Sequence, residues 1–191
     1  MNRDEALKLV KEKIQNQNLV KHCLAAEACM RELAKHFKEP EEQWGLTGLL
    51  HDIDYEETKN DPQKHSVLGA EMLEKLGVDK EICEAVKTHN EAHGIAPESK
   101  MAKAIFAVDP LTGLIVAATL VMPASPSGGP SKKISDLTPE NVLNRFKEKG
   151  FARGANREII SKCQELLGLS LEEFIKIGLR AMQSIANELG L

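Results

Sequence analysis

Six side chains of the types that bind transition metals occur where a helical reading of the sequence turns them toward apolar faces. They are His22, His51, Asp52, His65, His89 and Asp109. A single histidine on such a face is more often a hydrogen-bonded core residue than a ligand. A buried carboxylate, however, costs free energy unless a cation pairs with it, and no Lys or Arg shares these faces. One or two divalent metal ions would satisfy all six groups at once, and the sequence therefore predicts a metal centre.

The adjacent pair His51 and Asp52 follows the apolar run that ends at Leu50. Neighbouring residues on a helix are splayed by about 100°, so the two cannot chelate from one helical face. At a helix end, the imidazole can reach one metal while the carboxylate reaches across, and a carboxylate can bridge two metals. Mixed nitrogen and oxygen ligands favour Fe, Mn, Co, Ni or Zn over Mg or Ca.

Other metal and nucleotide motifs are excluded by spacing. The sequence contains no H-E-x-x-H of the zincins, and no Glu stands three residues before a His as in ferritin-like di-iron bundles. It also lacks the G-x-x-x-x-G-K-[ST] of P-loop proteins and the G-x-S-x-G of esterases.

The elements that must position these groups are all helical. Asn2 and Glu5 have the spacing of a capping box, and Leu7, Val10 and Ile14 continue with a helical period. Further helices are predicted at about 18–37, 41–52, 64–76, 79–90, 99–121, 139–149, 155–167 and 171–189. Alternating strand patterns do not occur. The predicted fold is a compact all-α bundle, with Pro110 expected to kink the helix beside Asp109.

Three segments are predicted. Residues 1–122 form a metal-binding helical domain, residues 123–135 a loop rich in Pro, Ser and Gly, and residues 136–191 a helical extension packed on the same domain. Thr138 with Pro139 and Ser170 with Glu173 mark helix starts in the extension.

Composition limits the partners and the compartment. The net charge of −4 and pI of about 5.9 give no electrostatic case for duplex nucleic acid or an anionic membrane. The longest apolar run, 114–123, is about ten residues and is expected to be too short to span a bilayer. The four cysteines form no C-x-x-C, and the N-terminus lacks an apolar signal region, so a reducing cytoplasm is expected.

The ordered set His22, His51-Asp52 and Asp109 resembles the signature of the HD-domain superfamily of metal-dependent phosphohydrolases, H…HD…D on a helical bundle. His65 and His89 resemble the six-ligand variant that holds two metals. The resemblance covers about residues 18–122. Many members read HDIGK at the pair, whereas this chain reads HDIDY, which removes a lysine often found near the substrate phosphate.

The resemblance implies the roles of individual residues. Asp52 would bridge or anchor the metals, with His22, His51 and Asp109 on one and His65 and His89 on the other, and the activated water would attack a phosphoester or phosphoanhydride. The substrate would be a nucleotide or another small phosphorylated molecule. Apart from the resemblance, Asp54 is a candidate general base or ligand-orienting group, and His93 is a candidate contact to a ligand residue or to the substrate. Lys132, Lys133, Arg153 and Arg157 are candidate phosphate contacts.

Two other classes share this ligand set. The chain would then be a nucleotide- or metal-sensing module with little turnover, or an HD-type di-iron oxygenase. The sequence does not separate these alternatives, and it leaves the oligomeric state open.

Overall fold

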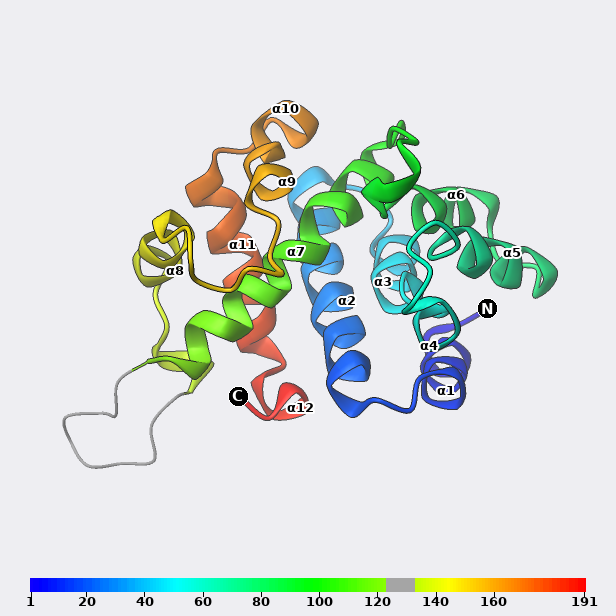
Figure 1. The fold of residues 1–191 in the computed structure, drawn as a ribbon, viewed down its shortest axis with the longest axis horizontal. Helices are drawn as coiled ribbons and strands as arrows, with labels where there is room; N and C mark the ends of the chain where they lie inside the picture. The colour runs from blue at the N-terminus through cyan, green and yellow to red at the C-terminus, as the bar shows by residue number, and fades with distance from the viewer. Residues whose placement is uncertain (123–132) are drawn as a thin grey trace.

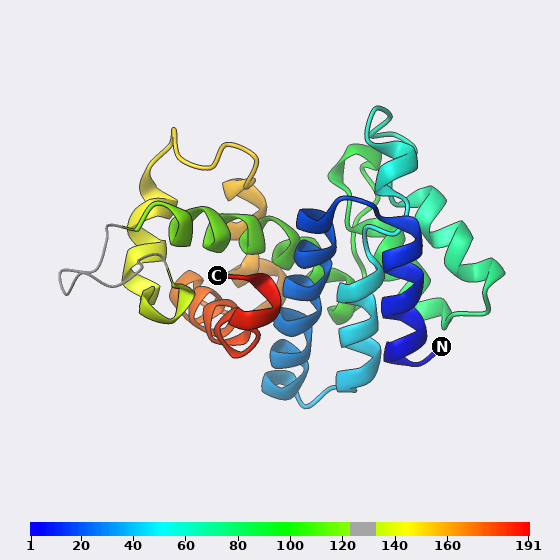
Figure 2. The ribbon, with the colours of Figure 1, turned by 90° about the horizontal axis from the view of Figure 1, so that it is seen from below.

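The computed structural model describes residues 1–122 and 133–191, and within these ranges the chain is helical and contains no strand (Figures 1 and 2). The all-α prediction is confirmed. The helices are α1 (Arg3–Lys13), α2 (Gln17–Phe37), α3 (Glu41–Leu50), α4 (Tyr55–Thr58), α5 (Val67–Lys75), α6 (Lys80–Thr88), α7 (Lys100–Leu120), α8 (Pro139–Lys147), α9 (Arg157–Ser161), α10 (Cys163–Leu167), α11 (Leu171–Ser184) and α12 (Ala186–Leu189), with short 3-10 turns η1 (Glu91–His93) and η2 (Ile134–Asp136).

Side-chain caps start several of these helices. The Asn2 side chain accepts from the backbone N–H of Glu5, whose carboxylate accepts from the backbone N–H of Asn2. Ser170 caps α11 by accepting from the backbone N–H of Glu173. Each cap satisfies N–H groups that the first helical turn leaves without partners, and these starts lie where the sequence predicts them.

Two long helices, α2 and α7, form the centre of the molecule. Helix α3 lies beside α2, and α1 packs on the other side of α3, while α5 and α6 lie at one end of the bundle (Figures 1 and 2). In the extension, α11 packs against both α2 and α7, and the Cys29 thiol of α2 donates to the carbonyl of Gly178 in α11 at 3.6 Å. Buried residues of the extension, such as Phe174 and Met182, belong to the same hydrophobic core as those of α2 and α7.

Helix α7 has the length and the apolar composition of a membrane-spanning helix. By length and composition it is the one helix of the described ranges that could cross a membrane, although its longest apolar run is short. Two-thirds (67%) of its apolar window is buried inside the bundle. Its composition is therefore accounted for by its place in the core.

Helices α2 and α3 are in close backbone contact at Gly48. A Cβ on this residue would lie 2.6 Å from the carbonyl oxygen of Ala26, which is backbone and cannot move aside without shifting α2. We expect Gly48→Ala to destabilise the protein by about 1–3 kcal/mol, as overpacking does. Urea unfolding followed by circular dichroism measures this change. An unchanged midpoint would show that the two helices separate at no cost.

Three predicted helices differ clearly from the structure in their limits. The helix predicted over 64–76 begins at Val67, because Ser66 adopts a left-handed backbone with φ of 72°. His65 therefore lies in a turn rather than on a helical face, as the sequence pattern suggested. The helix predicted over 155–167 is divided at Lys162 into α9 and α10, and the helix predicted over 171–189 is divided at Ile185 into α11 and α12. The loop predicted over 123–135 falls mostly outside the described residues, and its last part contains η2.

Candidate metal centre

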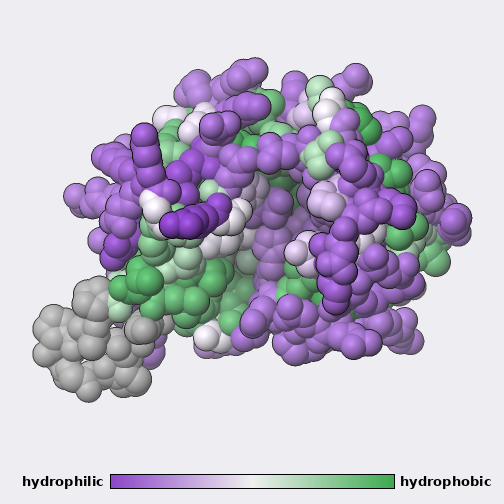
Figure 3. All heavy atoms as spheres, viewed as in Figure 1, coloured by the Kyte–Doolittle hydropathy of each residue, from purple (hydrophilic) through white to green (hydrophobic). Residues whose placement is uncertain are grey.

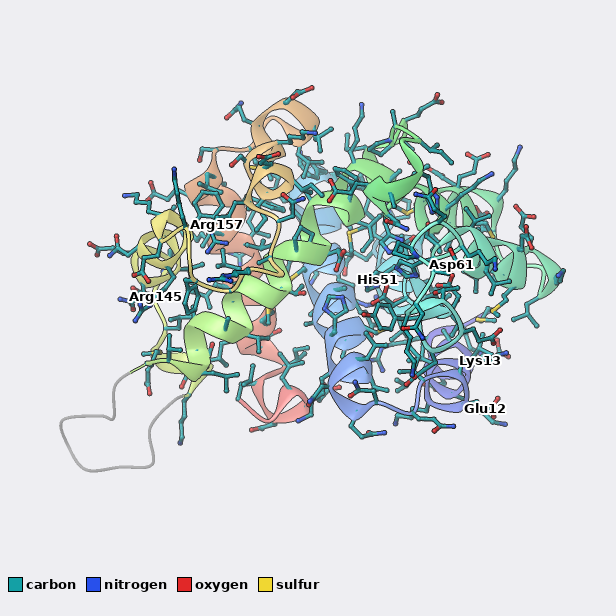
Figure 4. The ribbon with its side chains drawn as sticks, viewed as in Figure 1. Glu12, Lys13, His51, Asp61, Arg145 and Arg157 are labelled. Atoms are coloured by element: carbon teal, nitrogen blue, oxygen red, sulfur yellow. The ribbon has the colours of Figure 1, made fainter. Side chains whose placement is uncertain are left out.

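The six predicted ligands come from five separate places in the chain and meet between α2, α3 and α7, in the region where Figure 4 labels His51. His22 lies on α2 and Asp109 on α7. His51 and His89 are the residues that follow the last turns of α3 and α6. Each helix end points its terminal imidazole inward, so the helix packing decides how the ligands converge.

Asp52 lies at the middle of this cluster with one oxygen toward each half. Its Oδ2 is 3.6 Å from Nε2 of His22 and 3.5 Å from Nε2 of His51. Its Oδ1 is 3.2 Å from Nε2 of His65 and 3.5 Å from Nε2 of His89. Asp109 adds Oδ1 to the first half, 3.0 Å from Nε2 of His22. The arrangement is that of a carboxylate placed to bridge two cation sites.

The other ring nitrogen of each histidine is held by an acceptor. Nδ1 of His51 faces the carbonyl of Gly48 at 2.8 Å, and Nδ1 of His89 faces the carbonyl of Val86 at 2.7 Å. Because a carbonyl oxygen only accepts, both Nδ1 atoms must donate. In the neutral rings, the Nε2 lone pairs therefore point into the cluster.

The same tautomer follows for the remaining two histidines. Nδ1 of His65 lies 3.1 Å from Oδ1 of Asp54. Nδ1 of His22 lies 3.0 Å from the hydroxyl of Thr112, whose own proton goes to the carbonyl of Asp109 at 2.9 Å. Four lone pairs and two carboxylates thus face one another, which is favourable only with positive charge among them. Metal-binding histidines in proteins are held through their second nitrogen in this way.

The pKa values of these groups show the same demand for positive charge. Burial lowers the pKa of His51, but the carboxylates of Asp52 and Asp109 outweigh it and raise the pKa to about 9. Burial likewise lowers the pKa of His65, which hydrogen bonds to Asp52 and Asp54 raise to about 10. The histidines in turn hold the pKa of the Asp52 carboxyl well below its usual value, although burial opposes this. The cluster is a site of negative potential that attracts cations.

The donor set fits two divalent ions. His22, His51 and Asp52 offer ligand atoms within 4.8 Å of one another, and Asp52, His65 and His89 offer a second such group. Imidazole and carboxylate ligands in this ratio are those of Zn, Fe, Mn, Co and Ni sites. The histidines of the second group have no carboxylate of their own besides Asp52, so we expect the second ion to be held more weakly.

Nuclearity can be tested by removing that second group. We expect the double variant His65→Ala, His89→Ala to hold about one metal ion fewer per chain than the wild type, because Asp52, His22, His51 and Asp109 remain. Metal analysis by plasma emission, with circular dichroism on the same sample, measures both content and fold. An unchanged metal content in the folded variant would show that only the first group coordinates.

Asp54 lies next to the metal centre and hydrogen-bonds to one of its histidines, His65. Its carboxylate is fully buried and accepts from Nδ1 of His65 and, at 2.8 Å, from the backbone N–H of Ser66. These two contacts occupy both oxygens and leave none directed toward the cleft. Of the two roles open to it, base or ligand orientation, the geometry favours orientation of His65.

His93 lies in η1 behind the turn that carries His65. Its Nε2 is 3.0 Å from the hydroxyl of Ser66 and 3.2 Å from Nδ2 of Asn90, and it also contacts the carbonyl of His65. It is not among the residues that line the cleft over the metal centre. His93 therefore stabilises the turn that carries His65 and does not contact the predicted ligand atoms.

The four predicted phosphate contacts do not gather at the centre. Lys132 lies outside the described residues, and Lys133 and Arg153 are exposed and do not line the cleft. The Arg157 guanidinium donates to carbonyls of the 145–155 segment, among them those of Phe146 at 2.8 Å and Glu148 at 3.1 Å. Figure 4 shows Arg157 beside α8 and α9, away from His51. Its donors hold this loop together, which leaves it poorly placed for a phosphate.

A cleft of about 430 Å³ opens over the metal centre. His22 and Asp109 face it with side chains 22% and 35% exposed, whereas the side chain of His51 is fully buried. Figure 3 shows this face hollowed near its middle, with hydrophilic residues at the floor. A substrate would therefore approach from the side of α7 and the extension.

The extension supplies part of this cleft, which the sequence did not predict. The Asn156 side chain donates to Glu91 at 2.8 Å, and both residues line the opening, as does Asn90. Asn90 and Asn156 also cap the turns that follow them, and this capping pattern is the one sequence signal they carry. Thr112 was also missed, although it lies three residues after Asp109 on the same helix.

The chain matches the family model of the HD domain over residues 19–114. It is 28% identical to Ribonuclease Y of Oleidesulfovibrio alaskensis over 146 residues, which cover 75% of this chain and 27% of that protein. It is also 28% identical to Ribonuclease Y of Lawsonia intracellularis over 145 residues, which cover 75% of this chain and 26% of that protein. It is 36% identical over 100 residues to Uncharacterized protein MJ0778 of Methanocaldococcus jannaschii, 50% of this chain and 57% of that protein.

The chain thus spans about a quarter of the length of the two ribonucleases that it resembles. No solved structure matches it. The family match covers half of the chain and contains all six groups of the metal centre, including the adjacent pair that faces both halves. The chain belongs to the HD domain family, within the superfamily of metal-dependent phosphohydrolases.

Proposed function

We propose that this protein hydrolyses a phosphoester or phosphoanhydride bond of a small phosphorylated molecule, such as a nucleotide, with two divalent metal ions. The observation that carries the proposal is the carboxylate of Asp52, which presents one oxygen to each group of histidines. Two ions held in this way would lower the pKa of a bound water, so that it loses a proton and hydroxide becomes available to attack phosphorus, and they would stabilise the charge that develops on the phosphoryl oxygens.

The residues of the chain keep this centre in place for the reaction. The carbonyls of Gly48 and Val86, the carboxylate of Asp54 and the hydroxyl of Thr112 fix the ring orientation of the four histidines. The centre therefore needs little rearrangement when substrate binds, which is how preorganised groups lower a reaction barrier. Because Asp109 and His22 are the exposed members, the phosphoryl group would approach over them.

The cleft has the size and charge of a small-molecule site. Its volume of about 430 Å³ lies in the range of ligand pockets. Among its described lining residues there is no Lys or Arg, and Glu91 places a carboxylate at the opening. A substrate with one phosphate fits this lining better than a polyphosphate, since the metal ions alone would offset its charge.

The similarity to the two ribonucleases supports a second candidate, cleavage of single-stranded RNA. An RNA strand requires cations along its phosphates. The described lining of the cleft contains no Lys or Arg, and the net charge of the chain is −4. Both observations favour a small-molecule substrate over RNA. A sensor with little turnover and a di-iron oxygenase would have the same ligand residues. Activity measurements on the metal-loaded protein distinguish these two alternatives from the hydrolase.

The test is a panel on the metal-loaded protein. The protein is loaded separately with Mn, Fe, Co, Ni or Zn and is incubated with phosphomonoesters, nucleoside mono-, di- and triphosphates and a single-stranded RNA. We expect inorganic phosphate to be released from a monophosphate with at least one metal, and oxygen uptake to stay at background. RNA fragments without phosphate release would establish the ribonuclease. Oxygen uptake with product formation would establish the oxygenase, and ligand binding without turnover the sensor.

A further inference from the structure

A second cleft adjoins the metal centre. It has a volume of about 490 Å³, lies between α2 and α7, and shares His22 and Gly113 with the cleft over the metals. Its walls are mostly apolar, with Ala25, Val116 and Leu120 among them. Figure 3 shows hydrophobic surface over the C-terminal part of α7, beside the hollow at the middle of this face.

Gly113 forms the boundary between the two clefts. It lies one helical turn after Asp109 on α7, and it is exposed. Glycine destabilises a helix interior relative to alanine, so its presence in a helix needs a reason. The fold provides none, because a Cβ on Gly113 would meet no atom within 4 Å and its φ is not positive. Gly48 and Gly178 differ, since a Cβ on either would collide with a neighbour.

The missing side chain instead leaves the path between the clefts open. We infer that the substrate crosses Gly113, with its phosphate at the metal centre and an uncharged apolar group, an alkyl chain or an aromatic ring, in the cleft between α2 and α7. This inference rests on the proposed function and narrows its substrate to phosphomonoesters with such a group.

The charges and the surface of the clefts agree with this placement. The described lining of the metal cleft has no Lys or Arg for a second phosphate, and the described lining of the second cleft is mostly apolar, with Lys21 as its one Lys or Arg. Transfer of one methylene group from water to an apolar wall strengthens binding by about fourfold. The affinity of a phosphorus ligand should therefore rise with the length of its chain.

Alkylphosphonates test this without turnover, because they carry a phosphate-like dianion that is not hydrolysed. Calorimetry on the metal-loaded full chain compares methyl-, butyl- and octylphosphonate. We expect butylphosphonate to bind at least ~10-fold more tightly than methylphosphonate, and octylphosphonate more tightly still. In Gly113→Leu, this gain with length should be lost, so that the three phosphonates bind with similar affinities. Lys176→Leu, an exposed position on α11 outside both clefts, is the matched control and should keep the gain.

A second variant separates this role from a structural one. Because a Cβ at position 113 would meet no atom within 4 Å, Gly113→Ala should raise the melting temperature by about 2–4 °C and still weaken octylphosphonate binding. A lower melting temperature would show that the fold requires the glycine, which overturns the inference. Equal affinities for the three phosphonates, or a gain with length that persists in Gly113→Leu, would also overturn it while leaving the proposed function intact. Failure of methylphosphonate itself to bind, together with no phosphate release from the panel, would overturn the proposed function.

Discussion

Replacing Asp52 with asparagine is expected to lower phosphoesterase turnover at least ~100-fold while the protein stays folded. Asparagine has the shape of aspartate but lacks its negative charge, and its amide nitrogen would face the Nε2 atoms of one half of the centre. Loss of a residue that only supports a ligand already costs 10–100-fold in activity or metal affinity, and Asp52 contacts both groups of histidines. Steady-state phosphate release and thermal unfolding on one preparation measure the two effects.

The matched control is Asp79→Asn. Asp79 caps α6 by accepting from the backbone N–H of Glu81, and asparagine is an equally good cap. We expect this variant to keep both activity and melting temperature. If Asp52→Asn were folded and as active as Asp79→Asn, Asp52 would be a helix-end carboxylate, and the two-metal proposal would be wrong.

Removal of the metal is expected to lower the melting temperature by roughly 10 °C, because an ion that binds only the native state stabilises it in proportion to its affinity. Protein purified without chelator should hold between one and two transition metal ions per chain. His51→Ala should lose most of this metal, since the His51 ring is fully buried and its Nε2 lies 3.5 Å from Oδ2 of Asp52, the carboxylate that faces both halves. Metal analysis and calorimetric unfolding before and after dialysis against chelator give both quantities.

His36→Ala serves as the control for this experiment. His36 is exposed on α2 and lies outside both groups of predicted ligands. This variant should retain the metal and the chelator-dependent melting temperature of the wild type. A wild-type protein without metal, whose melting temperature does not change on addition of Zn, Mn, Fe, Co or Ni, would contradict the site.

Much of the fold could be predicted from local pattern. The helical period in α2 and α7 placed His22 and Asp109 on inward faces, and the capping residues marked the starts of α1 and α11. Both features depend on residues within one or two turns of each other, so a sequence contains them directly. The turn at Ser66 could not be predicted, because its left-handed backbone is stabilised by contacts with Asp54 and with the carbonyl of Lys87, 12 and 21 residues away.

Two features of the site could not be predicted from the charges of its residues. Arg157 was a reasonable phosphate contact by charge, yet the structure directs its donors to nearby carbonyls, since the loop before α9 needs hydrogen-bond partners. Asn156 and Glu91 meet at the cleft although 65 residues separate them. Neither the charges of these residues nor the helical period of the sequence predicts that they lie close together.

The sequence by itself determined the fold class, and it singled out the six candidate ligands because a carboxylate among apolar residues is costly wherever its segment lies. Only the tertiary structure decided that Asp52 turns one oxygen to each pair of histidines, that the four Nε2 atoms point inward, and that Gly113 joins two clefts. These features depend on how α2, α3, α6 and α7 pack together. That packing is a sum of many weak contacts between distant segments, which no local spacing in the chain records.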